Sequence, residues 1–398
     1  MPETVFISGM GIVSGIGNNV EETLSSLLAK KSGIGKLRFL ETIHDLPCAE
    51  VQISDKEFKQ RLSIPDNEIV TRTALFGIYA VKEALEQAKL STDGSLKIAF
   101  INGTTVGGME KSELYYFDFL ENDSRNEYIA AHDCGACTEK IADYFGGFSY
   151  VSTPSTACSS AANAFILGAN LIEAGIVDIA IAGGSECITK FHLNGFNTLM
   201  ILDSKECRPF DQTRAGLNLG EGAAYLVLES EKTMKKRGVK PLCSLAAYGN
   251  ACDAYHQTAS SPDGQGAFLA MSAALEMSGL QPKDIAYINA HGTGTSNNDE
   301  SEGKAIVRVF GENPPYVSST KSHTGHTTSA AGGVEAVISI LAMQNNFVPA
   351  NLNFKEKMES LPFEPVADII KNTELKHVLS NSFGFGGNNT SIIFSKVD

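Results

Sequence analysis

Residues 145–175 read FGGFSYVSTPSTACSSAANAFILGANLIEAG, and this stretch indicates how the whole chain is built. A β-rich run, FSYVST, leads through a polar turn into a helix-like segment of small residues that becomes apolar, and Gly175 is placed to end it. Residues 310–345, FGENPPYVSSTKSHTGHTTSAAGGVEAVISILAMQN, repeat this order of Phe-Gly, strand, turn and helix. Two copies of one strand-turn-helix unit predict two duplicated halves, with chance similarity as the alternative.

Apolar strand-like runs alternate with longer helix-like segments along the rest of the chain. The strand-like runs are TVFISGMGIV, LKIAFING, DIAIAGG, AAYLVLES, IAYINAHG and TSIIFSK, and clear helix-like segments are TALFGIYAVKEALEQAKL and GAFLAMSAALEMSGL. This alternation predicts an α/β fold in which helices cover sheets. The charged stretch ESEKTMKKRGVKP at 229–241 is a weak joint, so we expect two halves, residues 1–240 and 241–398, within one compact unit.

The composition limits the possible functions. With 398 residues and 43% hydrophobic content, the chain can bury a substantial core. A formal net charge of -14 offers no basic field for nucleic acid or anionic lipid, so we expect no nucleic-acid partner. No signal peptide and no membrane-spanning apolar run is visible, so we expect a cytoplasmic protein that binds no membrane. The eight cysteines are then expected to stay reduced.

Two short motifs give only weak indications of a cofactor. Cys134 and Cys137 have the spacing of a redox or metal pair, but a zinc site normally needs four ligands. The glycines of GMGIVSG at 9–15 resemble a dinucleotide-binding loop, yet the third glycine comes one place late. We therefore expect no metal and no redox cofactor.

Cys158 lies where the strand FSYVST passes into the predicted helix, which continues to about Ala174. The unpaired N–H groups at a helix start carry the positive end of the helix dipole and favour a thiolate. Small neighbours also leave room for a substrate. Cys158 is therefore a candidate nucleophile, and the alternative is a buried cysteine that acts as a small hydrophobic residue.

Three distant segments strengthen the case for catalysis. The strand IAYINA runs into HGTGTSNNDESE, so His291 lies just past the end of a strand, where open α/β folds commonly place their chemistry. The other two segments are KSHTGH at the turn of the second unit, with Lys321, His323 and His326, and the glycine-rich SNSFGFGGNNTS, with Phe383 and Phe385. Together they predict a thiol, at least two histidines and a mobile loop in one site.

The ordered set of motifs resembles the elongating β-ketoacyl-acyl-carrier-protein synthases of the thiolase superfamily, most closely the type II form of bacterial fatty-acid synthesis. The matching motifs are FISGMGIVS at 6–14, TACSS at 156–160, AGGSE at 182–186, RPFD at 208–211, LGEGA at 219–223, DAYH at 253–256, HGTGT at 291–295, KSHTGH at 321–326 and NSFGFGG at 381–387. The resemblance spans nearly the whole chain. It implies a thiolase-like five-layer α/β/α/β/α fold of two pseudo-duplicated halves, and a homodimer.

The resemblance also implies a reaction. Cys158 would accept an acyl chain from a pantetheine thioester, and His291 and His326 would complete the catalytic triad. Loss of carbon dioxide from malonyl-acyl carrier protein creates an enolate, whose oxygen needs hydrogen-bond donors such as the Nε2–H of two neutral imidazoles. Backbone N–H groups of Cys158 and Phe385 would form the oxyanion hole. The product would be a 3-oxoacyl-acyl carrier protein that is two carbons longer.

Supporting residues follow from the same resemblance. Lys321 would disfavour protonation of the histidines, and Glu302 falls in the position of the glutamate that partners it. His323 lies where the family has no catalytic histidine, so it is expected to be only a neighbour. The remaining matches are Thr258, Thr293 and Thr295 as pantetheine contacts, Phe385 as the gate with Phe383 beside it, and Val106 and Met109 as acyl-channel lining.

The chain departs from the family at three places. Residues 110–144 match poorly, in a region expected to cap the acyl pocket and contribute to the dimer, and Asn388 stands where the final loop usually has threonine. The segment around Glu68 and Ile69 lacks the basic pair that the resemblance implies for docking acidic carrier protein. The basic residues that could compensate are Arg72, Arg125, Lys205 and Arg208. These departures keep open a specialised polyketide or aryl-polyene pathway.

Other chemistries would require residues that differ from those in this sequence. A biosynthetic thiolase would need a second cysteine near the C-terminus, whereas the last cysteine is Cys252. An initiating synthase would pair cysteine with histidine and asparagine. A non-catalytic chain-length partner subunit would lack the nucleophile. A metal hydrolase on His291, His323 and His326 would need an acidic ligand that the spacing does not provide.

Overall fold

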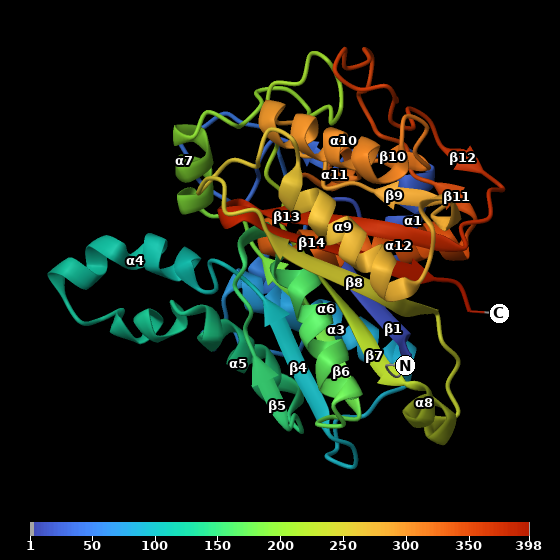
Figure 1. The fold of residues 1–398 in the computed structure, drawn as a ribbon. Helices are drawn as coiled ribbons and strands as arrows, with labels where there is room; N and C mark the ends of the chain where they lie inside the picture. Colours follow the sequence, from blue (N-terminus) through green and yellow to red (C-terminus); the bar gives the residue numbers. More distant parts are fainter. Residues whose placement is uncertain (1–3, 398) are drawn as a thin grey trace.

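The strands form a sheet because their apolar residues are continuous enough to be buried on both faces. The structure is a computed structural model that describes residues 4–397, and within this range ten strands form one mixed sheet (Figure 1). Those of the first half are β1 (Val5–Ser14), β4 (Ile98–Gly103), β5 (Tyr150–Ser152), β6 (Ile179–Glu186) and β7 (Gly222–Ser230). Those of the second half are β8 (Cys243–Cys252), β9 (Tyr287–Asn289), β10 (Tyr316–Ser318), β13 (His377–Gly384) and β14 (Asn388–Ser395).

The strand order repeats outward from the centre of the sheet. One side runs β1-β7-β6-β4-β5 and the other runs β8-β14-β13-β9-β10. In each half the first two pairings are antiparallel and the last two are parallel. The halves join where β1 pairs antiparallel with β8 at Val5, Phe6 and Ile7. The predicted duplication is therefore confirmed, and it extends to the pairing direction of every strand.

Helices cover both faces of each half and give the predicted five layers. On the outer faces, α3 (Arg72–Ala88) packs on β1 and β7, and α9 (Gln265–Ser278) packs on β8 and β14. Between the halves, α6 (Ser160–Glu173) contacts α12 (Ala331–Gln344), and each of these helices also touches strands of both halves. α6 ends at the place predicted, because Gly175 adopts the left-handed backbone with φ +68.

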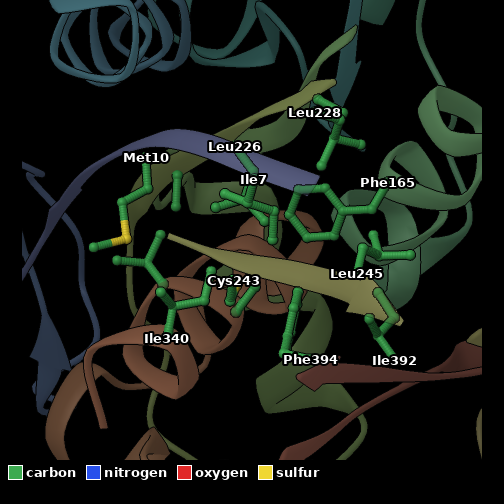
Figure 2. Packing of buried hydrophobic residues seen from close by; sticks show 14 of the residues in the cluster. Ile7, Met10, Phe165, Leu226, Leu228, Cys243, Leu245, Ile340, Ile392 and Phe394 are labelled. Atoms are coloured by element: carbon green, nitrogen blue, oxygen red, sulfur yellow. The ribbon is translucent and has the colours of Figure 1, made fainter. Parts of the chain in front are cut away.

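The core lies on both sides of the strands. Leu226 and Leu228 of β7 face the central helices, while Tyr225 and Val227 face α3. Figure 2 shows the central cluster, in which Phe165 of α6 lies among side chains of β1, β7 and β8. Alternation within one strand thus fills two separate apolar layers.

Gly9 and Gly11 of β1 allow a helix to pack closely on this strand. A Cβ at Gly9 would lie 2.5 Å from Ala84 O, and one at Gly11 would lie 2.0 Å from Ala80 O. Both glycines therefore let α3 lie directly on β1. This close approach accounts for the motif that resembled a dinucleotide loop.

The remaining elements are shorter or peripheral. They are α1 (Val20–Leu28), β2 (Ile34–Gly35), β3 (Cys48–Ala49), α2 (Asp55–Arg61), α4 (Met109–Glu121), α5 (Cys134–Phe145), α7 (Lys190–Thr198), α8 (Glu231–Arg237), α10 (Ser296–Phe310), α11 (Lys321–Thr324), β11 (Phe347–Val348) and β12 (Ile370–Lys371). α4 buries none of its residues and projects from the body (Figure 1). None of the helices in residues 4–397 has the length and apolarity needed to cross a membrane.

Candidate functional site

One cavity of about 280 Å³ collects candidate residues from both halves of the chain. Cys158 comes from the first half, at the entrance to α6, and His291 and His326 come from the second half. The other predicted residues that line the cavity are Thr258, Thr293, Thr295, Phe383 and Phe385. The repeated topology of the two halves brings Cys158 close to the histidines, because the turns before α6 and α12 lie against each other between the halves.

Cys158 lies in a short 3-10 turn, Ala157–Ser159, directly before α6. Its Sγ is 3.1 Å from His326 Nε2. Burial raises the pKa of the thiol to about 11, although the Lys321 cation and the backbone N–H of Phe385 act in the opposite direction. Burial therefore favours the neutral thiol in the resting site, in contrast to the thiolate that the helix start was expected to favour.

His326 is fixed by its backbone rather than by its ring. Its N–H donates to Asn218 O at 2.7 Å, and its carbonyl accepts from Gly220 N at 2.9 Å. Burial and the Lys321 cation hold the imidazole pKa well below its ordinary value, so the ring is neutral. Within the described residues Nδ1 is buried without a hydrogen-bond partner, so its surroundings do not fix the tautomer.

His291, by contrast, has a defined tautomer. Its Nδ1 lies 3.1 Å from the Nζ of Lys321, and an ammonium group can only donate. Nδ1 must therefore accept, which leaves the hydrogen of the neutral ring on Nε2. Burial and the same cation hold the pKa of His291 well below its usual range. The two imidazole rings lie nearly perpendicular, with centroids 5.3 Å apart.

The predicted partner of Lys321 is wrong. The buried ammonium forms its ion pair with Glu335 of α12 and also donates to His291 O at 2.6 Å. Glu302 instead accepts the backbone N–H groups of His291 at 2.8 Å and Gly292 at 2.7 Å, so it holds the loop after β9. Burial raises the pKa of Glu302 to about 7. Sequence spacing could not separate the two glutamates, because both belong to helices that begin near the site.

Aromatic side chains close one side of the cavity. The ring of Phe385 stacks on Phe196 of α7 with centroids 5.8 Å apart. Phe196 was not identified from the sequence. The sequence shows only that it is an aromatic residue in a segment to which no role was assigned. Val106 and Met109 lie outside the lining of this cavity, so their place in an acyl channel stays a prediction.

His323 is a structural link beside the site. One ring nitrogen contacts Lys31 O at 2.9 Å and the other contacts Ala350 O at 3.0 Å. It does not line the cavity with His326. Among residues 4–397 no group of three or more histidines, cysteines and carboxylates could hold a metal ion, which leaves the metal-hydrolase alternative without a ligand set. Cys134 and Cys137 are free thiols at the start of α5.

Glu186 was overlooked although it ends the AGGSE motif. Its buried carboxylate accepts hydrogen bonds from Thr104 Oγ1 at 2.7 Å and Thr105 N at 2.9 Å. It also accepts from the hydroxyl of Ser329, three residues after His326. This carboxylate therefore ties the end of β4 to the turn that carries His326.

The basic residues proposed for carrier docking are not equivalent. Arg72 is buried and donates to Glu221, to Asp55 and to backbone carbonyls, so its assignment as a docking residue is wrong. Arg208 is held by an ion pair with Asp203 at 3.0 Å. The other two proposed residues, Arg125 and Lys205, are exposed, and Arg125 lies over the ring of Tyr115.

Comparisons with known proteins agree over nearly the whole chain. Residues 2–234 match the family model "Beta-ketoacyl synthase, N-terminal domain", and residues 242–355 match "Beta-ketoacyl synthase, C-terminal domain". A curated relative from Staphylococcus aureus (strain N315), "3-oxoacyl-[acyl-carrier-protein] synthase 2", is 31% identical over 407 residues, which cover 99% of this chain and 98% of the relative.

Solved structures give the same result. "The ishigamide ketosynthase/chain length factor" superposes with a TM-score of 0.93 and 29% identity, covering 100% of both chains. The structure described as "Ketosynthase (ApeO) in Complex with its Chain Length Factor (ApeC) from Xenorhabdus doucetiae" has a TM-score of 0.85 and 31% identity, covering 99% of this chain and 98% of the other.

Proposed function

This chain belongs to the beta-ketoacyl synthase family, and we propose that it is an acyltransferase that extends an acyl group by two carbons, using malonyl-acyl carrier protein. The observation that carries the proposal is the cavity that brings Cys158, His291 and His326 together, with Sγ 3.1 Å from His326 Nε2. A thiol and two neutral imidazoles are the groups that a decarboxylative condensation needs.

The first step loads the acyl group. The Cys158 sulfur attacks the carbonyl of an acyl thioester on the carrier, the carbon–sulfur bond to pantetheine breaks, and the proton passes to the departing pantetheine thiol. His326 Nε2 is close enough to accept that proton from Sγ and return it. Because the ring tautomer of His326 is not fixed by its neighbours in the described chain, the same nitrogen can later act as a donor.

The second step forms the new bond. Malonyl thioester loses carbon dioxide, and the enolate oxygen accepts hydrogen bonds from Nε2–H of His291 and His326. The enolate carbon attacks the acyl carbonyl on Cys158, and the resulting oxyanion lies between the backbone N–H groups of Cys158 and Phe385. Collapse releases the cysteine sulfur and a 3-oxoacyl-acyl carrier protein. Lys321 supports the step by holding His291 in the donor tautomer.

Substrate contacts follow the cavity. Thr258, Thr293 and Thr295 line it and offer hydroxyl groups to the amides of a pantetheine arm. Phe385, stacked on Phe196, is the gate, and displacement of this pair opens the way for the acyl chain. Val106 and Met109 are proposed to line the acyl channel beyond the gate.

We propose that this cytoplasmic enzyme acts as a homodimer, each subunit one compact unit of two halves, residues 1–240 and 241–398. β5 is one edge of the sheet, and its Val151 is 42% exposed, so this edge is available to pair with a second subunit. The opposite edge, at β10, is already covered, because the N–H of Val366 donates to Val317 O. Leu114, Phe117 and Leu120 of α4 are also exposed.

A specialised polyketide or aryl-polyene pathway is the second candidate for the biological role. The similarity to a ketosynthase that is solved with its chain length factor favours it. A non-catalytic partner subunit is disfavoured, because Cys158, His291 and His326 are all retained and lie together.

Mass spectrometry tests the reaction directly. The purified protein is mixed with malonyl-acyl carrier protein and a panel of acyl carriers, and both Cys158 and the products are analysed. We expect an acyl group on Cys158 and a product extended by two carbons, and neither should form with Cys158→Ala. Absence of extension with every acyl group would contradict the proposal, and the preferred acyl group separates the fatty-acid role from a specialised one.

A further inference from the structure

Met200 occupies an unusual position at the cavity rim. It lines the cavity of Cys158, yet the residue is 88% exposed. It follows the end of α7 in a left-handed conformation, with φ +56, and its N–H donates to Asn197 O at 2.9 Å. Glycine or asparagine normally fills such a position, because a Cβ is strained there. A strained backbone and an exposed apolar side chain at a cavity rim together indicate a function.

Among the residues that the structure describes, the cavity lining offers no charged side chain that could attract a partner. None of the described side chains that line the cavity belongs to lysine, arginine, aspartate or glutamate. Arg72 is buried in the interior, and Arg208 is engaged with Asp203. The chain itself has a net charge of -14, which repels an acidic protein at long range.

We infer that Met200, with Leu199 beside it, is an apolar contact surface for the carrier protein at the mouth of the cavity. This inference rests on the proposed function. A thioester that reaches Cys158 on a pantetheine arm brings the body of its carrier against this rim, and that body is the only occupant the reaction requires there. A flexible methionine suits the task, because one surface must accept both the acyl- and the malonyl-loaded carrier.

The test compares substrates with and without the carrier body. For Met200→Ser, the ratio of kcat/KM for malonyl-acyl carrier protein to kcat/KM for the free malonyl-pantetheine thioester should fall about tenfold. Met200→Leu, which keeps an apolar side chain, should restore most of the ratio. Ile43→Ser, at a residue 94% exposed and outside the cavity lining, is the matched control and should leave the ratio unchanged.

Salt dependence provides an independent readout. Because the contact is apolar, the Kd of the carrier for the unsubstituted enzyme should change less than about threefold between about 50 and about 500 mM NaCl. An unchanged ratio in Met200→Ser, or a steep salt dependence that Lys205→Glu abolishes, would overturn the inference. Failure of the proposed function looks different, since the unsubstituted enzyme would then extend neither carrier-bound nor free thioesters.

Discussion

Lys321 is buried between an imidazole and a carboxylate, and its ammonium affects both. It contacts Nδ1 of His291 at 3.1 Å and pairs with Glu335. An ammonium cannot accept, so His291 keeps its hydrogen on Nε2 and remains neutral. A neutral ring in a fixed tautomer can donate to a developing enolate oxygen without reorganisation. In the proposed reaction, Lys321 therefore acts through His291.

Replacing Lys321 should slow decarboxylation selectively. Lys321→Ala leaves Glu335 buried without its cation, so the paired variant Lys321→Met with Glu335→Gln removes both charges. In each variant release of carbon dioxide from malonyl-acyl carrier protein should fall about 100-fold, because the His291 tautomer is no longer fixed. Cys158 should still be alkylated by iodoacetamide. Unchanged decarboxylation in the paired variant would remove Lys321 from the mechanism.

The pH dependence of Cys158 alkylation follows from its burial. Because burial raises the thiol pKa to about 11, the reactive thiolate is a small fraction at neutral pH and increases as pH rises. The alkylation rate of the Cys158 peptide, followed by mass spectrometry, should rise about tenfold per unit between about pH 7 and 10. A plateau beginning below about pH 8 would show that the thiolate is already stable in the resting site.

At the level of elements, the end of β13 packs against the short 3-10 turn, Ala157–Ser159, that precedes α6. A Cβ at Gly384 would lie 2.9 Å from Thr156 O and 3.0 Å from Cys158 N. The glycine therefore allows the loop that carries Phe385 to approach the cysteine, and the proposed oxyanion hole depends on that approach.

Gly384→Ala should move the backbone N–H group of Phe385 away from that of Cys158. We expect kcat to fall about 100-fold or more, since loss of one oxyanion donor typically has an effect of this size. Gly35→Ala is the matched control, because a Cβ there meets nothing within 4 Å and should leave kcat unchanged. Steady-state kinetics together with thermal unfolding measure both effects. Full activity in a folded Gly384→Ala enzyme would exclude this oxyanion hole.

Some elements could be predicted and others could not. The unit around Cys158 was identified because a strand, a turn and a small-residue helix follow one another in the sequence. α4 was not predicted, because it buries none of its residues and its apolar side chains Leu114, Phe117 and Leu120 are exposed.

At the scale of the whole molecule, we expect the exposed apolar side chains of α4 to hold two subunits together in the proposed homodimer. Phe117 is 75% exposed and Leu120 is 68% exposed. Phe117→Asp combined with Leu120→Asp should convert the dimer to a monomer in analytical ultracentrifugation, because a buried unpaired carboxylate is costly. Ile43→Asp, at a position 94% exposed, should leave the dimer intact. A monomeric unsubstituted protein would contradict the proposed assembly.

The sequence alone determined the α/β class, the duplication and the three residues that meet in the cavity, Cys158, His291 and His326, because strand and helix patterns and short motifs are local properties of the chain. Tertiary structure decided which carboxylate meets Lys321, that Arg72 is internal, and that Cys158 rests as a thiol. These outcomes depend on burial and on contacts across many residues, such as Glu186 with Ser329. Linear spacing carries no information about desolvation, and desolvation sets the charge of each buried group.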